Sequence, residues 1–372
     1  MTYRIAVLCG GESTEHEISI ISAKNITQAL LQGGYTVEVI YITHRGRWYH
    51  VPNARTFTED GISSAVLAES GAVPLWLNPG QRDATFHRED GVAFGVDVVF
   101  PALHGTHGED GVPQGVLSAL GLPYVGAPVL GSAIAMHKGI AKILLHAAQI
   151  PVVPWIEITR QQFESGEITY EQAARQLGAT LFIKPAQLGS SVGVHKVKSL
   201  ADWKRCVQDA FRYDTSILVE AAIAGRELEC AVLGNALPKA TWPGELVIHH
   251  EFYSYEAKYQ DPNGATIVTR AEIAPTVAAA IQAYALKAFA VLQLKGLARI
   301  DFFLSHTGDI YLNEANTIPG FTAISMYPKM WEAEGLPYVE LVNQLVTLAL
   351  AEHQANTRLE RVYQAAVSTQ RV

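Results

Sequence analysis

The sequence predicts an α/β protein with more than one domain, and three observations support this. The chain begins with a strand, a glycine loop, a helix and a second strand, at residues 5–9, 10–11, 18–31 and 37–42, the usual order in α/β folds. Its 372 residues, 49% of them apolar, suffice for two or three domains with substantial cores. Two apolar runs at residues 298–304 and 310–316, separated by a polar turn, are typical of a hairpin.

Composition excludes several classes of function. The net charge is −8 with no run of five like charges, which argues against a nucleic-acid-binding surface. The cysteines Cys9, Cys206 and Cys230 form no CxxC pair, which fits a reducing compartment. The first apolar run is too short for a signal peptide, and polar residues interrupt the apolar run at 277–294, which excludes a membrane span. We expect a soluble cytoplasmic protein without a nucleic-acid or membrane partner.

The polar segment at residues 12–17 leads into the first helix and has two interpretations. Ser13 or Thr14 can cap the helix, with acidic residues at its positive end. Alternatively, Glu15 points into a cleft above the sheet edge, where α/β folds bind ligands. The glycines at 10–11 do not form G-x-G-x-x-G, so the dinucleotide fingerprint is absent.

A second glycine-spaced loop, at residues 102–111, follows a strand at 96–101 and precedes a helix at 114–120. It contains His104 and His107, but no third ligand has the usual metal spacing. We therefore expect these histidines to meet substrate. A short strand at 122–126 closes this domain near residue 130. Residues 46–95 are loop-rich and carry no identifiable chemistry.

The middle of the chain contains a candidate phosphate-binding site. A helix predicted at 132–145 carries Lys138 and Lys142, and a strand at 181–185 carries Lys184 before a loop with Ser190 and Ser191. No P-loop is present. A glycine-rich hairpin can nevertheless close over phosphates while a strand lysine holds their charge. The alternative is an ordinary hairpin with a glycine turn.

Two further strands, at 217–220 and 225–232, carry Glu220 and Glu227. An acid at these positions can accept hydrogen bonds from adenine or ribose, or it can be a solvated edge residue. The polar and aromatic loop at 251–266 has the length of a lid or binding loop. A helix at 277–292, the hairpin, a glycine loop at 317–325 and a helix at 338–352 complete the chain before a polar tail.

The hairpin has the most distinctive chemistry. Side chains alternate faces along a strand, so Arg299 and Asp301 share one face, as do Glu314 and Asn316. If the strands pair as a hairpin, all four can converge. Carboxylate and amide oxygens suit a hard cation such as Mg²⁺, and an arginine is a donor fork for an anion. The alternative is a hairpin with one solvated face.

Six motifs in the same order resemble those of the D-alanine–D-alanine ligase family, in the ATP-grasp superfamily. No single motif is decisive, but six in order over residues 3 to about 350 are specific. They lie at residues 10–19, 104–111, 184–193, 255–259, 299–301 and 314–320. The resemblance implies an ATP-grasp fold with an N-terminal Rossmann-like (pre-ATP-grasp) α/β domain. We expect domains at 1–130, 131–225 and 226–355, and a polar tail at 356–372.

The resemblance also implies an activity. Members join two D-alanines through a D-alanyl phosphate, releasing ADP and phosphate, for peptidoglycan synthesis in the cytoplasm, usually as homodimers. ATP and two Mg²⁺ ions, with Mn²⁺ as an alternative, are the implied cofactors. D-alanine–D-lactate ligase and a non-catalytic ATP-grasp nucleotide-binding module are the competing readings. The family associates Tyr259, in place of Phe, with the dipeptide product, and a binding module has no evident need for Arg299.

The resemblance assigns site residues position by position. Glu15 holds the ammonium of the first D-alanine, and Ser190 orients Glu15 and Tyr259. Arg299 and the Gly320 backbone form the oxyanion site, and Ser325 binds the second carboxylate. The remaining substrate contacts are His104 and Met326. The nucleotide contacts are Lys138, Lys184, Ser191, Glu220, Glu227, Lys258 and Asn313. The metal ligands are Asp301, Glu314 and Asn316. Residues 186–188 and 221–222 depart from other members, which leaves the adenine contacts open.

Overall fold

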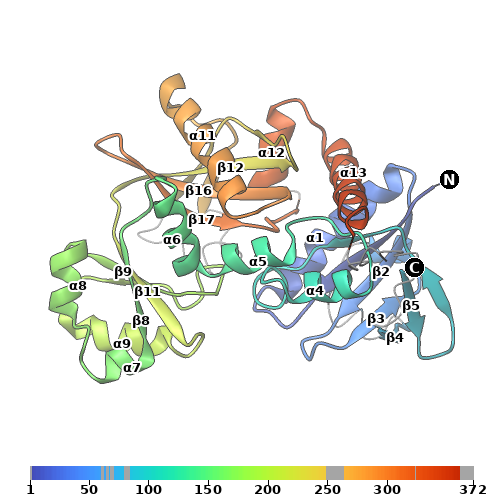
Figure 1. The fold of residues 1–372 in the computed structure, drawn as a ribbon, viewed down its shortest axis with the longest axis horizontal. Helices are drawn as coiled ribbons and strands as arrows, with labels where there is room; N and C mark the ends of the chain where they lie inside the picture. Colours follow the sequence, from blue (N-terminus) through green and yellow to red (C-terminus); the bar gives the residue numbers. More distant parts are fainter. Residues whose placement is uncertain are drawn as a thin grey trace, which may run out of the picture.

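The computed structural model describes residues 2–59, 63, 67, 71–78, 84–248, 264–322 and 324–360. Within these residues the strands form three sheets, of seven, four and six strands. Figure 1 shows the four-stranded sheet with α7–α9 as a separate lobe, the six-stranded sheet beneath α11, and the seven-stranded sheet at the opposite side. No helix within the described part of the chain is long and apolar enough to cross a membrane.

The first sheet has the order β6-β5-β4-β3-β2-β1-β7. Its strands are β1 (Arg4–Gly10), β2 (Thr36–Ile42), β3 (Trp48–Val51), β4 (Val73–Trp76), β5 (Thr85–Arg88), β6 (Ala93–Gly95) and β7 (Val98–Pro101). β1 is parallel to β2 and β7, as the opening pattern predicts. The loop-rich segment at 46–95 supplies the antiparallel strands β3 to β6. The strand expected at 122–126 is wrong, since only an isolated bridge joins Tyr124 to Val99.

Helix α1 (His16–Gln32) packs on β1 and meets α13 (Tyr338–Thr357) from the far end of the chain. Figure 1 shows α13 beside the N-terminal sheet. Buried side chains of both helices and of β1, including Ile26, Leu345 and Val7, form one continuous core. The C-terminal helix is therefore part of what holds the N-terminal sheet. The short helices α2 (Ala54–Phe57) and α4 (Val112–Ala119) complete this part.

The single helix expected at 132–145 is wrong. The structure has α5 (Val129–Met136) and α6 (Lys138–Ala147), separated at His137. His137 has φ −84° and ψ 93°, an extended conformation that ends α5. Its Nδ1 accepts from the Ile140 N–H at 3.3 Å and so caps α6. A side-chain cap at a helix start satisfies a backbone donor that would otherwise be unpaired. The break places Lys138 at the first position of α6.

The second sheet has the order β10-β9-β11-β8. Its strands are β8 (Trp155–Thr159), β9 (Leu181–Pro185), β10 (His195–Val197) and β11 (Ser216–Ala221). The helices α7 (Arg160–Glu164), α8 (Tyr170–Leu177) and α9 (Leu200–Ala210) supply the residues that bury one face, such as Trp203 and Val207. β9 and β10 pair antiparallel around the glycine-serine loop, which confirms the predicted hairpin.

The third sheet contains β12 (Gly225–Gly234), β13 (Lys239–Ala240), β14 (Gly244–Ile248), β15 (Ala265–Val268), β16 (Gly296–Ser305) and β17 (Ile310–Asn316). β16 lies between β12 and β17. Figure 1 shows helix α11 (Pro275–Val291) over this sheet, and buried side chains of α11 share one core with Phe302 and Ile300. Helix α12 (Met326–Ala333) follows the glycine loop after β17. The opposite face of the sheet remains for the polar residues of the hairpin.

Candidate functional site

The hairpin of β16 and β17 gathers its polar side chains on one face, as the alternation predicts. Arg299 pairs with Asn316, and Asp301 with Glu314. Directly opposed residues in an antiparallel pair project to the same face. On the other side of β16, Glu229 of β12 pairs with Asp301. Glu229 therefore joins the same face, which sequence reasoning missed.

Arg299 is held by two carboxylates. Its Nε and NH2 donate to the two Asp301 oxygens, both at 2.7 Å, and Nε lies 3.1 Å from Glu229 Oε2. Burial works against the charged guanidinium, but Asp301 and Glu229 outweigh it and raise the pKa of Arg299. The guanidinium is thus a fixed positive charge at the centre of the face.

The donor set on this face fits a hard divalent cation. Asp301 and Glu314 offer carboxylate oxygens, and Asn316, whose Nδ2 donates to Asp301 Oδ2 at 2.9 Å, offers an amide oxygen. The ladder shifts register after Asp301, so Asn313 has no opposite residue. An all-oxygen donor set suits Mg²⁺, which keeps room for phosphate oxygens.

Three lysines approach this face from neighbouring elements. Lys138 Nζ lies 3.5 Å from Glu314 Oε2 and donates to the Leu188 carbonyl at 2.7 Å. Lys184 Nζ donates to Asn313 Oδ1 at 3.2 Å and lies 2.8 Å from a Glu220 oxygen. The third is Lys142, which sequence reasoning left out of the site although it lies four residues after Lys138.

Glu15 lies between the two glycine loops. Its side chain is buried, and a Cβ placed on Gly105 or Gly189 would come within 2.8 or 3.2 Å of its Oε2. Helix α1 begins directly after Glu15 with no side-chain cap, so the cap expected from Ser13 or Thr14 is wrong, although Glu17 does place an acid in the first turn. The Glu15 carboxylate faces the Gly/Ser loop. Ser190 and Ser191 in that loop have φ of 53° and 58°, and such left-handed backbone in non-glycine residues is often found at functional sites.

The glycine loop after β17 is fixed to the N-terminal domain. Glu109 accepts from the Ile318 N–H at 2.8 Å and the Gly105 N–H at 3.0 Å. His104 Nδ1 donates to the Ile318 carbonyl at 3.0 Å, and its Nε2 bonds to Ser22 Oγ at 2.9 Å. Both ring nitrogens of His104 are thus already paired within the protein. Together these bonds fix the loop that leads to Gly320.

Gly320 and Ser325 lie side by side, since a Cβ on Gly320 would be 2.8 Å from Ser325 Oγ. Ser325 Oγ also accepts from the Thr322 N–H at 2.9 Å. Met326 differs from them because its side chain is buried in the core, against the backbone at Gly244. Two predicted site residues, Lys258 and Tyr259, lie outside the described residues.

Glu109 gives a pH-dependent prediction. Burial, and then the nearby Glu15 charge, raise the pKa of Glu109 to about 8. Between about pH 4.5 and that value the folded protein retains a proton that the unfolded chain has lost, so folding stability falls as pH rises through the window. We expect the free energy of unfolding to drop by about 1–2 kcal/mol more in the wild type than in Glu109→Gln between about pH 6 and about pH 9. Urea unfolding of both proteins at each pH measures this, and equal pH dependence would contradict it.

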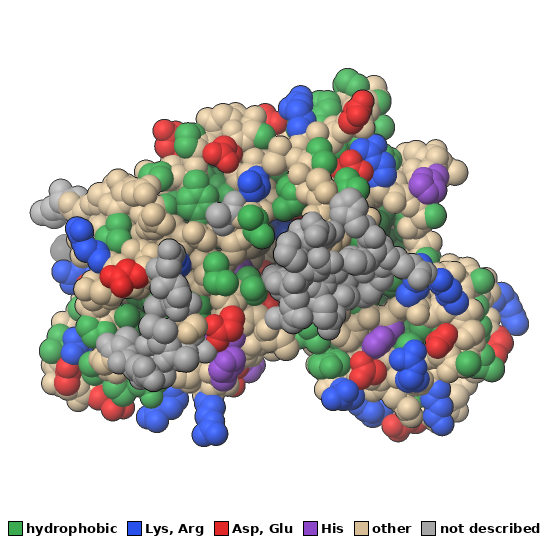
Figure 2. Space-filling view, turned by 180° about the vertical axis from the view of Figure 1, so that it is seen from behind, with side chains coloured by type: hydrophobic (Ala, Val, Ile, Leu, Met, Phe, Trp, Pro, Cys, Tyr) green, Lys and Arg blue, Asp and Glu red, His purple; other side chains and the backbone are tan. Residues whose placement is uncertain are grey.

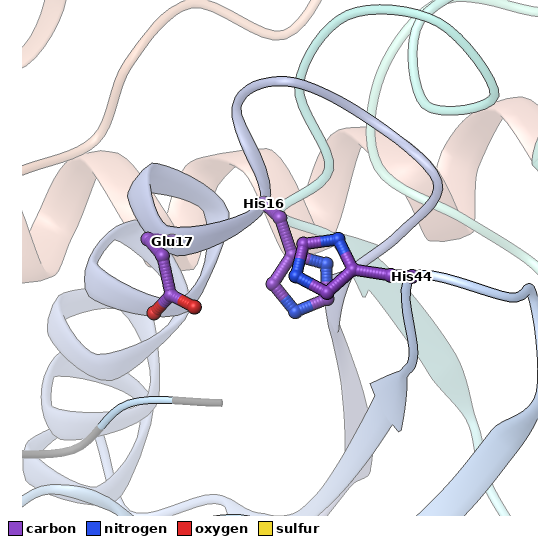
Figure 3. Close-up of side chains that lie close together, drawn as sticks. All are labelled: His16, Glu17 and His44. Carbon is purple, nitrogen blue, oxygen red and sulfur yellow. The ribbon is translucent and has the colours of Figure 1, made fainter. Parts of the chain in front are cut away.

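One cluster outside the site resembles a metal site in residue type. His16, Glu17 and His44 have ligand atoms within 4.8 Å of one another, and Figure 3 shows the two imidazoles face to face beside Glu17. Their centroids are 3.6 Å apart with planes 22° apart, so their in-plane lone pairs do not converge. His16 also bonds through both nitrogens, to the Gly11 carbonyl and the Tyr41 hydroxyl. The cluster is a stacked pair that supports the start of α1.

Charged side chains are mixed over the surface of the four-stranded lobe. Figure 2 shows Lys, Arg and acidic side chains interspersed there, at the lower right. Several of them form local pairs, such as Arg212 with Asp209 on α9 at 2.9 Å. Exposed pairs of this kind contribute little to stability and indicate no ligand.

Two family models together match most of the chain. The model described as D-ala D-ala ligase N-terminus matches residues 4–127, and the one described as D-ala D-ala ligase C-terminus matches residues 144–347. The D-alanine–D-alanine ligase of Coxiella burnetii (strain RSA 493) is 46% identical over 363 residues, with 97% of each chain covered. D-alanine–D-alanine ligase A of Salmonella typhimurium is 42% identical, covering 96% of this chain and 98% of its own.

Solved structures give the same result. The Coxiella burnetii D-alanine–D-alanine ligase superposes with a TM-score of 0.84 at 42% identity, over 96% of this chain and 98% of its own. The VanG D-Ala:D-Ser ligase from Enterococcus faecalis superposes with a TM-score of 0.84 at 32% identity, over 94% and 100%. These likenesses confirm the predicted ATP-grasp fold with its N-terminal α/β domain.

Proposed function

Because the chain belongs to the D-alanine–D-alanine ligase family, we propose that it joins two D-alanines through a D-alanyl phosphate. The reaction uses ATP and releases ADP and phosphate. The observation that carries the proposal is the face where Arg299, Asp301, Glu314 and Asn316 meet. A protein that only bound nucleotide would not need a buried arginine beside its metal ligands.

The substrate groups are assigned to the residues around the two glycine loops. Glu15 binds the ammonium of the first D-alanine, since it is the buried carboxylate between those loops. Ser190 orients Glu15 and Tyr259. Ser325 and the Gly320 backbone bind the carboxylate and the oxyanion that forms on attack by the second amine, with Arg299 opposite. His104 positions the Ile318 carbonyl, and so Gly320, and Met326 contributes through packing at the start of α12.

The nucleotide lies between the four-stranded and six-stranded sheets. Lys138 and Lys184 hold its phosphates, since both approach Glu314 or its neighbour Asn313. Glu227 is on the same sheet face as Arg299 by the β12 register and accepts from the nucleoside, as does Glu220. Ser191 and Lys258 complete the phosphate contacts. Asp301, Glu314 and Asn316 hold two Mg²⁺ ions, or Mn²⁺, which offset charge on the transferring phosphoryl group when bound.

Membership of the family supports a proposal for the wider setting of the reaction. D-alanyl-D-alanine is made for peptidoglycan, and the requirement for ATP places the reaction in the cytoplasm. The working form is a homodimer. The domains run over 1–130, 131–225 and 226–355, with a polar tail at 356–372; the three sheets, which lie within residues 4–101, 155–221 and 225–316, support this division.

One experiment tests the activity and its main competitor. The purified protein is mixed with ATP, Mg²⁺ and D-alanine, and ADP and dipeptide are measured by chromatography. We expect ADP release that depends on D-alanine, with one dipeptide per ADP. D-lactate or D-serine added in competition should be incorporated less well than D-alanine at neutral pH. ADP release without dipeptide would contradict the proposal, and preferred incorporation of D-lactate would assign the chain to depsipeptide synthesis.

A further inference from the structure

Lys142 is a buried charge to which the reaction described above gives no role. It lies on α6, its side chain is 1% exposed, and Nζ is 3.0 Å from Glu220 Oε1. The ammonium also donates to the Val153 carbonyl at 3.2 Å. An isolated buried ammonium is strongly unfavourable, so Glu220 is what keeps Lys142 inside the protein as a cation.

Glu220 is shared between two lysines. Its Oε2 lies 2.8 Å from Lys184 Nζ, while Oε1 faces Lys142. Lys184 in turn reaches Asn313 Oδ1 at 3.2 Å. A continuous line of contacts therefore runs from α6 through β11 and β9 to β17, where Asn313 precedes Glu314.

The charges in this line do not cancel. Two ammonium groups face one carboxylate, so the cluster of Lys142, Glu220 and Lys184 carries one surplus positive charge at neutral pH. Burial lowers the pKa of Lys142 to about 8 against the opposing effect of Glu220. Burial also acts on Lys184, but Glu220 and Glu314 outweigh it and raise its pKa. Lys142 and Lys184 therefore both remain charged below about pH 8, and Glu314 attracts both.

We propose that Lys142 is a positioning residue for ATP: by holding one oxygen of Glu220, it lets Glu220 orient Lys184 without neutralising the charge that Lys184 offers to phosphate. The inference rests on the proposed function, because ATP is the ligand that benefits. Without Lys142, Lys184 and Glu220 would form a neutral pair that still points at Asn313 but attracts phosphate less.

Variants that change the net charge of the cluster of Lys142, Glu220 and Lys184 test the proposal. Lys142→Met keeps the chain length but leaves the cluster neutral, and we expect ATP to bind on the order of tenfold more weakly, from the Coulomb energy of one charge at moderate dielectric. Lys142→Arg keeps a positive charge beside Glu220, so this conservative variant should bind ATP more tightly than Lys142→Met does. The KM for D-alanine should change by less than about twofold in Lys142→Met.

Calorimetry with ATP and Mg²⁺ in the absence of D-alanine measures the binding directly. This readout is separate from the ligase assay, so failure of the proposed function would appear as missing dipeptide in the wild type while the binding comparison still stands. Lys204→Met changes an exposed lysine on α9, in the lobe that carries Lys184 and Glu220; it is the matched control and should bind ATP as the wild type does.

The outcomes that overturn the proposal are specific. Wild-type ATP binding by Lys142→Met, or Lys142→Arg binding ATP no more tightly than Lys142→Met, would reduce Lys142 to a structural residue. If Lys142→Met does not fold, the pair Lys142→Gln and Lys142→Arg carries the test, because both side chains are polar and they differ in charge. Lys142→Gln should then bind ATP on the order of tenfold more weakly than Lys142→Arg, since its surplus is smaller by one charge, and equal binding would overturn the proposal.

Discussion

Glu314→Gln is expected to lower turnover by roughly a hundredfold or more, above the loss typical of a residue in the outer shell of a metal site. Glu314 lies opposite Asp301 in the hairpin and 3.5 Å from Lys138 Nζ. A carboxylate can bridge two cations through its two oxygens, whereas an amide offers one oxygen and no charge. The variant should also need more Mg²⁺ for half-maximal activity.

Steady-state ADP release over a range of Mg²⁺ concentrations measures both effects. Asp309→Asn is the matched control, because it makes an acid-to-amide change on the same hairpin at the exposed turn, where Asp309 bonds to Ser305 and Thr307. That control should keep wild-type turnover. Glu314→Gln should still fold, because the Glu314 side chain is partly exposed. Wild-type turnover of Glu314→Gln at limiting Mg²⁺ would remove Glu314 from the metal ligands.

The hairpin could be predicted from sequence because its information is local. Alternation along one strand places Arg299 with Asp301, and a short turn forces the second strand back beside the first. The convergence of the four polar groups also needs the register shift after Asp301, which brings Glu314 and Asn316 opposite Asp301 and Arg299 and which the sequence pattern does not indicate. The first α/β unit was predictable for the same reason, since a glycine loop and an amphipathic helix connect adjacent parallel strands.

Contacts between distant segments could not be predicted in this way. Glu109 and Ile318 are 209 residues apart, and no periodicity in either segment indicates that one holds the other. The same applies to Lys142 on α6, because its partner Glu220 lies on β11, a strand of the second sheet. The break between α5 and α6 was missed because helix propensity and apolar spacing continue through His137, where an extended backbone ends α5 and the side chain caps α6.

Arg299 is fixed more firmly than an ordinary surface arginine. Its two bonds to Asp301 form a planar fork, and Glu229 adds a third contact from the next strand. A guanidinium can make all of these contacts while keeping one edge for an anion, but a lysine ammonium is a point charge on a flexible stem. A conservative substitution therefore separates charge from geometry at this position.

Arg299→Lys is expected to lower kcat by roughly a hundredfold, the cost typical of losing one donor aimed at an oxyanion, while ATP binding changes little because the lysines that hold phosphate are untouched. Arg226→Lys is the matched control. Arg226 forms the same fork, with Glu245, but projects from the opposite face of β12, so its turnover should match the wild type. Measuring kcat and ATP binding in both variants separates the two roles. Equal loss in both would point to a distorted sheet, and an unchanged kcat in Arg299→Lys would remove Arg299 from the oxyanion site.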